Sequence, residues 1–94
     1  MERGELERTL EEMLSRHMAD EAITLVETYY GEGGEDSDRI RYLAGNAWRK
    51  KGNWQKAMDN YLEAVAMNPA SPAAGALEIA GDILAFYNKD MYNQ

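Results

Sequence analysis

The chain has 94 residues, which is the size of one domain that must bury most of its apolar surface to be stable. Hydrophobic residues make up 45% of it and charged residues 29%, a composition typical of a folded globular chain and not of a disordered one. The net charge of −7 makes nucleic acids and anionic membranes poor partners, and the lack of cysteine excludes disulfides and cysteine nucleophiles.

The sequence also indicates a cellular location. It has no apolar run long enough to cross a membrane, and residues 1–10 do not show the charged-then-apolar pattern of a leader. The zero cysteine count fits a reducing compartment. We therefore expect a cytoplasmic protein.

The first third of the chain predicts a helical hairpin. Over about residues 5–16, leucines recur at helical spacing on one face and glutamates on the other. Asp20 and Glu21 favour the start of a second helix over about residues 19–31, which Gly31 ends. The glycine-rich, acidic segment that follows, residues 31–37, is expected to be a mobile loop.

The central segment predicts a second hairpin, with helices over about residues 38–51 and 54–67. Ser37 or Asp38 is expected to cap the first of these helices. Between the two helices, Gly52 favours the left-handed conformation that ends a helix, and Asn53 is a typical cap for the next one. Pro69 then ends the second helix because proline has no amide hydrogen to donate.

Two small residues in this hairpin predict close packing of its helices. Helices that cross at the short end of the usual range of about 8–10 Å need Gly or Ala where their backbones meet. Gly45 and Ala57 are expected to form that contact. A Gly45→Leu substitution should therefore separate the helices and unfold the chain.

The last part of the chain predicts one more helix over about residues 72–88. Ser71 is expected to cap it, with Pro72 as its first residue. An apolar stripe along this helix would close the end of the helical stack. The polar tail, residues 89–94, contains Met91 and Tyr92, and its pattern leaves open whether it frays or packs back.

The central hairpin resembles the tetratricopeptide repeat, a helix–turn–helix unit of about 34 residues with small and aromatic residues at set positions. The residues that match its signature, or are close substitutes, are Gly45, Trp48, Gly52, Ala57, Tyr61, Ala64 and Pro69. Arg41 and Ala44 depart from it, since Trp and Leu usually stand there. An offset of 35 residues places the first hairpin on the second, with His17 at the turn position of Gly52.

This resemblance implies an all-α domain, an α-α superhelix, over residues 1–94. It would contain a degenerate repeat at 3–36, a well-matched repeat at 38–71, and a capping helix with its tail at 72–94. The resemblance also implies a concave face made by the first helix of each hairpin. The repeat positions exposed there fall on Arg39, Tyr42, Asn46, Arg49 and Lys50.

These five residues suggest a site for a carboxylate or an extended acidic peptide, because charge-assisted hydrogen bonds to oxygen are strong and directional. Some members of the family hold a C-terminal carboxylate with a Lys and an Asn. Asn46 fits that pattern, but Tyr42 stands where the Lys would be.

Charge is distributed unevenly along the chain. Residues 1–38 carry 3 basic and 12 acidic side chains, residues 39–56 carry 6 and none, and residues 57–94 carry 1 and 5. The six cations of the middle segment, here called the basic strip, are Arg39, Arg41, Arg49, Lys50, Lys51 and Lys56. Two interpretations stay open. The basic strip either complements the acidic neighbouring helices, at about 0–1 kcal/mol per exposed pair, or attracts an acidic peptide.

The sequence offers little support for catalysis. His17 is the single histidine, so a histidine pair for a metal is excluded. The acidic loop lacks the ligand spacing of an EF-hand, and no glycine motif has the form that cradles phosphate. We expect a non-enzymatic module that binds a protein or peptide, without cofactor or metal. The alternative is a self-associating structural component, whose contact would use apolar residues of the last helix, Ala80, Ile83 and Leu84.

Overall fold

The computed structural model describes the backbone of residues 1–87 and the side chains of residues 1–83. Every regular element within residues 1–87 is a helix, so the expected all-α fold is confirmed. The helices are α1 (Arg3–Ser15), α2 (Ala19–Gly31), α3 (Asp38–Lys50), α4 (Trp54–Met67) and α5 (Ala73–Tyr87). Their ends lie within two residues of the predicted bounds. The expectations for the tail and for the Leu84 side chain fall outside the described residues.

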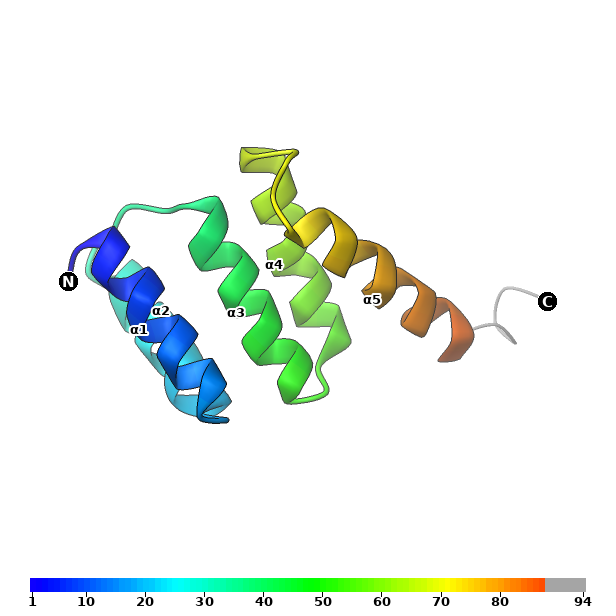
Figure 1. The fold of residues 1–94 in the computed structure, drawn as a ribbon, viewed down its shortest axis with the longest axis horizontal. Coiled ribbons are helices and arrows are strands. Elements are labelled where there is room, and N and C mark those ends of the chain that lie inside the picture. The colour runs from blue at the N-terminus through cyan, green and yellow to red at the C-terminus, as the bar shows by residue number, and fades with distance from the viewer. Residues whose placement is uncertain (88–94) are drawn as a thin grey trace.

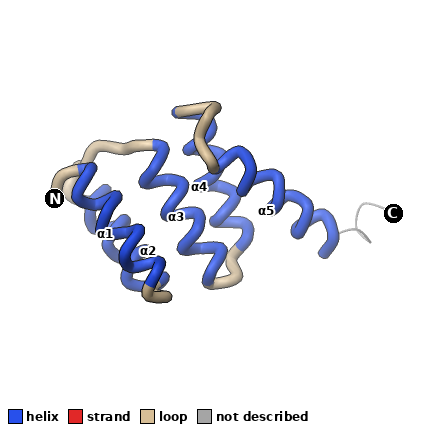
Figure 2. The backbone as a smooth tube through the Cα atoms, in the orientation of Figure 1, coloured by secondary structure: helices blue, strands red, loops and turns tan. Residues whose placement is uncertain are grey.

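The helices follow one another as a stack of antiparallel neighbours. Figures 1 and 2 show α1 and α2 side by side at the N-terminal end, with α3 and α4 next to them and α5 beyond α4. The central helix α3 contacts α1, α2 and α4, whereas α5 contacts α4. The molecule is elongated along the stack, with a longest extent of 48 Å against 26 and 22 Å in the other directions.

Three of the helices begin where a side chain caps them, as the sequence predicted. The Ser37 hydroxyl accepts a hydrogen bond from the Ile40 amide at 3.0 Å at the start of α3. The Asn53 side chain accepts one from the Lys56 amide at 3.1 Å at the start of α4. The Ser71 hydroxyl accepts one from the Ala73 amide at 3.1 Å, where α5 begins. Each bond satisfies an amide that has no partner inside its own helix.

The turns of the two hairpins have the same backbone geometry. His17 and Gly52 both have positive φ angles, 61° and 82°. The amide after each of them bonds back to a carbonyl five residues earlier: Met18 to Met13 at 2.9 Å, and Asn53 to Trp48 at 3.0 Å. The helix starts show the 35-residue offset that the sequence predicted. Helix α1 begins at residue 3 and α3 at residue 38, and α2 begins at residue 19 and α4 at residue 54.

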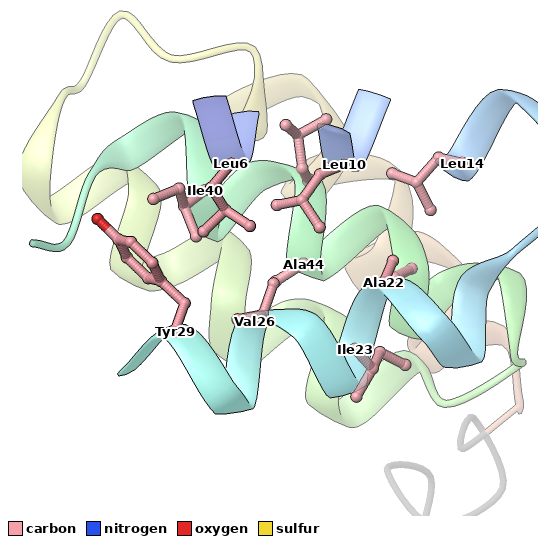
Figure 3. Packing of buried hydrophobic residues seen from close by; sticks show 11 residues of the cluster. Leu6, Leu10, Leu14, Ala22, Ile23, Val26, Tyr29, Ile40 and Ala44 are labelled. Carbon is pink, nitrogen blue, oxygen red and sulfur yellow. The ribbon is translucent and has the colours of Figure 1, made fainter. Parts of the chain in front are cut away.

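The apolar faces of the helices bury two adjoining cores. The first lies among α1, α2 and α3, and Figure 3 shows side chains of these helices pointing toward one another. The second lies between α4 and α5. Its buried residues are Ala57, Tyr61, Ala64, Ala73 and Ala80. Tyr42 and Trp48 of α3 pack against both cores and thereby join them.

The glycine of α3 makes room for an aromatic ring. A Cβ atom at Gly45 would lie 2.4 Å from Cε1 and 2.6 Å from Cδ1 of Tyr61, far closer than carbon atoms approach without a bond. Ala57 is fully buried in the same core, one turn before Tyr61 on α4. The absence of a side chain at Gly45 therefore lets the Tyr61 ring approach α3 closely, and the expected contact between Gly45 and Ala57 stays a prediction.

The loop between α2 and α3, which was expected to be mobile, contacts two tyrosines of α2. The Tyr29 ring lies against Gly34, where an added Cβ atom would come within 2.5 Å of it. The Tyr29 hydroxyl donates to the Glu35 carbonyl at 2.6 Å, and Tyr30 donates to the Asp36 carboxylate. Gly34 therefore allows the Tyr29 ring to pack against the loop.

Asp36 joins this loop to α3. The Arg41 Nε atom donates to both oxygens of the Asp36 carboxylate, at 3.1 and 3.0 Å, and the Arg41 guanidinium lies 4.6 Å from the centroid of the Tyr30 ring. Burial by itself raises the pKa of Asp36, but the hydrogen bonds from Arg41 and Tyr30 outweigh it, so this pKa lies below its ordinary value of 3.8. Arg41, which stands where the repeat signature usually has Trp, thus connects α3 to the loop.

Candidate peptide-binding surface

The five residues predicted to bind a peptide lie on α3. Arg39 is in its first turn and Lys50 is its last residue. Tyr42, Asn46 and Arg49 are spaced by four and three residues, so they follow one another along one face of the helix. The structure therefore brings three of the five into one row and places the other two at its ends.

Arg39 is occupied by an ion pair inside the molecule. Its guanidinium contacts the Glu11 carboxylate of α1, and both side chains are close to half exposed. An exposed pair of this kind is worth about 0–1 kcal/mol, so a ligand could replace it at little cost. Arg39 nevertheless serves first to join α1 to α3.

Tyr42 and Asn46 are positioned by Tyr61 of α4. The Tyr61 side chain is fully buried, and its hydroxyl donates to Asn46 Oδ1 at 2.6 Å. The Tyr42 ring lies 6.2 Å from the Tyr61 ring, between centroids. Because Asn46 uses its oxygen for this bond, its amide nitrogen keeps two hydrogens, and no acceptor for them occurs among residues 1–83. The buried tyrosine thus orients an amide donor on the predicted face.

Arg49 completes the row next to Asn46. Burial raises the pKa of the Tyr61 phenol above its ordinary value of 10.0, and the positive charge of Arg49 partly opposes this rise. Over the described part of the chain, neither Arg49 nor Lys50 forms an ion pair with a carboxylate.

The remaining cations of the basic strip have partners inside the molecule. Arg41 pairs with Asp36 at 2.9 Å, and Lys51 pairs with Asp20 of α2. The Lys56 ammonium lies 4.3 Å from the centroid of the Trp48 ring. The interpretation of the strip as a complement to acidic neighbours therefore holds for three of its residues, and the peptide-binding interpretation stays a prediction. Arg39, Arg41 and Lys51 complement the acidic first hairpin, whereas Arg49 and Lys50 remain available to a ligand.

The polar side chains considered for chemistry have structural roles. Ser37 and Ser71 cap helices, and the Ser15 hydroxyl donates to the Glu12 carbonyl at 2.7 Å. His17 is exposed in the turn between α1 and α2. In the described region, no three His, Asp or Glu side chains gather closely enough to hold a metal ion. A search of the same residues finds no helix with the length and apolar character to cross a membrane.

Sequence reasoning missed a hollow on another part of the molecule. It lies on the outer side of the first hairpin, between Met13 of α1 and Leu25 of α2. The pattern placed both residues on apolar helix faces and suggested no more than core packing for them. Their partial exposure is a tertiary property, because it depends on where the neighbouring helices end.

Comparison with solved structures gives one informative similarity. The solution NMR structure of Bacteroides fragilis protein BF1650 is 43% identical in sequence and superposes with a TM-score of 0.77. The match covers 94% of this chain and 89% of that one. The chain belongs to the same family as this Bacteroides protein. No protein-family model matches the chain, and no curated protein matches it.

Proposed function

We propose that the chain is a small tetratricopeptide-type module that binds an acidic peptide or protein segment along α3. The repeat assignment is supported by the 35-residue offset between the two hairpins and by the shared turn geometry at His17 and Gly52. The binding row consists of Tyr42, Asn46 and Arg49, and Lys50 extends it. Arg39 joins the row when a carboxylate of the ligand replaces Glu11 as its partner. The module is non-enzymatic, acts in the cytoplasm and needs no cofactor.

One observation carries this proposal: Arg49 and Lys50 keep two positive charges without a carboxylate partner among the described residues, and they follow the Asn46 amide by three and four residues on the same side of α3. Two cations and an amide donor offer hydrogen bonds to oxygen at several points along a peptide. The net charge of −7 disfavours nucleic acids and anionic membranes as partners of the same surface.

A binding assay with charge reversal tests the proposal. A library of acidic peptides is titrated into the wild type and into the Arg49→Glu/Lys50→Glu variant, with Trp48 and Trp54 fluorescence as the readout. We expect the variant to bind at least tenfold more weakly, a loss of about 1.4 kcal/mol. Lys56→Glu is the control, because Lys56 lies on the Trp48 ring and outside the row. Identical profiles for wild type and double variant would remove the row from the binding surface.

Self-association through α5 is the second candidate function, and one observation favours it. Ile79 of α5 is 55% exposed, which leaves an apolar side chain on the last helix open to a partner. Of the residues expected to be partly open, Ala80 needs correction because it is fully buried, whereas Ile83 is partly exposed as expected. Sedimentation at increasing protein concentration separates the two functions, since a monomer at every concentration excludes the second.

A further inference from the structure

The outer side of the first hairpin carries two hollows that adjoin at Met13. The larger, about 400 Å³, is bounded by Met13 and by a set of α2 residues: Asp20, Glu21, Thr24, Leu25 and Thr28. The smaller, about 210 Å³, is bounded by Met13 and by Thr9, Glu12, Arg16 and Met18. Met13 therefore lines both depressions. We call the residues of the larger hollow the outer face.

The outer face has the ridges and grooves by which helices pack on one another. Asp20, Thr24 and Thr28 form one row at four-residue spacing, and Glu21 and Leu25 form the next. Such rows are the ridges of one helix that fit the grooves of another. From Asp20 to Thr28 the face is about 12 Å long at 1.5 Å per residue, which is the length of about two turns of a partner helix.

The floor of the outer face is apolar and adaptable. Met13 and Leu25 are partly buried and pack against the first core, so their exposed atoms form an apolar surface on a rigid support. Methionine has a flexible, polarizable side chain that adjusts to different partner shapes. An apolar side chain of a partner would fit between these two residues.

The rim of the outer face is acidic. Asp20 and Glu21 lie at one end of it, and no cation lines the hollow. Asp20 pairs with Lys51, whereas Glu21 forms no ion pair within residues 1–83. The surrounding segment, residues 1–38, carries 12 acidic and 3 basic side chains. A partner must therefore bring positive charge together with its apolar side chain.

We propose that the outer face binds a basic amphipathic helix of a partner protein. One apolar side chain of that helix enters between Met13 and Leu25, and its Lys or Arg residues lie beside Glu21 and Asp20. A second copy of this chain is a poorer occupant, because its cation-rich helix, α3, already buries its apolar face between two cores. This surface is separate from the binding row on α3 and opposite to it in charge.

Methyl NMR with two matched peptides tests this inference. The probes are an 18-residue helical peptide of Leu, Ala and Lys with leucines on one face, and the same peptide with Glu at every Lys. We expect the Lys peptide to shift the Met13 and Leu25 methyl signals to saturation and the Glu peptide to leave them unchanged. Shifts confined to residues outside the hollow, or equal effects of both peptides, would overturn the proposal.

Charge-reversal variants separate a specific site from general attraction to an acidic protein. Thr24→Lys adds a positive charge to the outer face and Glu21→Lys reverses one there, and each should weaken Lys-peptide binding at least tenfold. Thr24→Lys should leave the circular dichroism melting curve unchanged, whereas Glu21→Lys should lower the melting temperature because Glu21 lies in the first turn of α2. Glu27→Lys makes the same charge change on α2 outside the hollow and should leave the affinity within twofold. If Glu27→Lys weakens Lys-peptide binding as much as the other variants, the proposed site is wrong. It is also wrong if the Met13 methyl signals move with protein concentration alone, because that would indicate binding of a second copy of the chain. Either result leaves the acidic-peptide assay on α3 unaffected.

Discussion

Two turn residues show that the same backbone conformation costs more free energy for one amino acid than for another. His17 and Gly52 both lie in the left-handed region, with φ angles of 61° and 82°. A side chain there costs about 1–2 kcal/mol, whereas glycine pays no such penalty. The first hairpin therefore contains a strained residue at a position where the second does not.

We predict that His17→Gly stabilises the protein by about 1 kcal/mol, because it removes this strain from an exposed turn. For a domain of this size that corresponds to a rise in melting temperature of about 4–8 °C, measurable by thermal denaturation. Gly52→Ala is the reciprocal control and should lower the melting temperature. A Cβ atom at Gly52 meets no atom within 4 Å, so that loss would report backbone conformation alone.

A second residue-scale prediction concerns Gly45. Gly45→Ala should destabilise the fold by about 1–3 kcal/mol, because the added Cβ atom would overlap the Tyr61 ring at 2.4 Å. Urea denaturation measures the change in the free energy of unfolding. Gly75→Ala in α5 is the matched control, since open space surrounds that glycine and alanine is the better helix former there. Equal effects of the two substitutions would contradict the close packing of Gly45 on Tyr61.

At the scale of elements, the connection between α2 and α3 depends on Asp36. Its carboxylate accepts hydrogen bonds from Tyr30 and Arg41, which belong to the two helices that the loop joins. The folded state thus favours the ionised carboxylate. A low folded-state pKa means that the contribution of Asp36 to stability is fully present above about pH 4 and is lost as the pH falls through its folded-state value.

We therefore predict that Asp36→Asn lowers the free energy of unfolding at pH 7 by about 1–3 kcal/mol. The free energy of unfolding of this variant should also fall less steeply than that of the wild type as the pH decreases. Urea denaturation at a series of pH values from 7 to 3 measures both effects. Glu35→Gln is the neighbouring control, because Glu35 is 75% exposed in its pair with Arg3 and should contribute little. A parallel acid profile for wild type and Asp36→Asn would show that the loop is not held by this charge.

At the scale of the whole molecule, α3 is the element on which both halves depend. The first core buries one side of it and the second core lies beyond Tyr42 and Trp48. Ion pairs from Arg39 and Lys51 tie it to the first hairpin. In a stack whose elements contact only their neighbours, stability is close to a sum of local terms, so a helix with partners on several sides opens last.

This arrangement predicts unequal hydrogen exchange. Amides of α3 should exchange only through global unfolding, whereas amides of α5, which packs on α4, should exchange through a local opening of lower free energy. Native-state exchange in low denaturant measures both. An Ala80→Gly substitution in α5 should increase the difference, because it removes a buried methyl group from the second core alone. Uniform protection of α3 and α5 would indicate one indivisible cooperative unit.

Much of the fold could be predicted from sequence because its signals act within a few residues. Ser37, Asn53 and Ser71 cap helices where they were expected to, since a capping side chain reaches amides only two or three residues away. The apolar spacing placed the helices to within two residues for a related reason, because side chains three and four apart share a face in any helix.

The candidate sites depended on tertiary structure. The sequence by itself determined the five helices, the caps of three of them and the position of a basic strip in an acidic chain. Only the fold decided that Arg39, Arg41 and Lys51 are paired while Arg49 and Lys50 are not, that Gly45 receives the Tyr61 ring, and that Met13 borders two hollows. Helix formation is set by neighbours along one helix, whereas the pairing of a charge or the filling of a space is set by residues of other elements, from 5 positions away for Arg41 and Asp36 to 31 for Lys51 and Asp20, whose distance is fixed only when the helices pack.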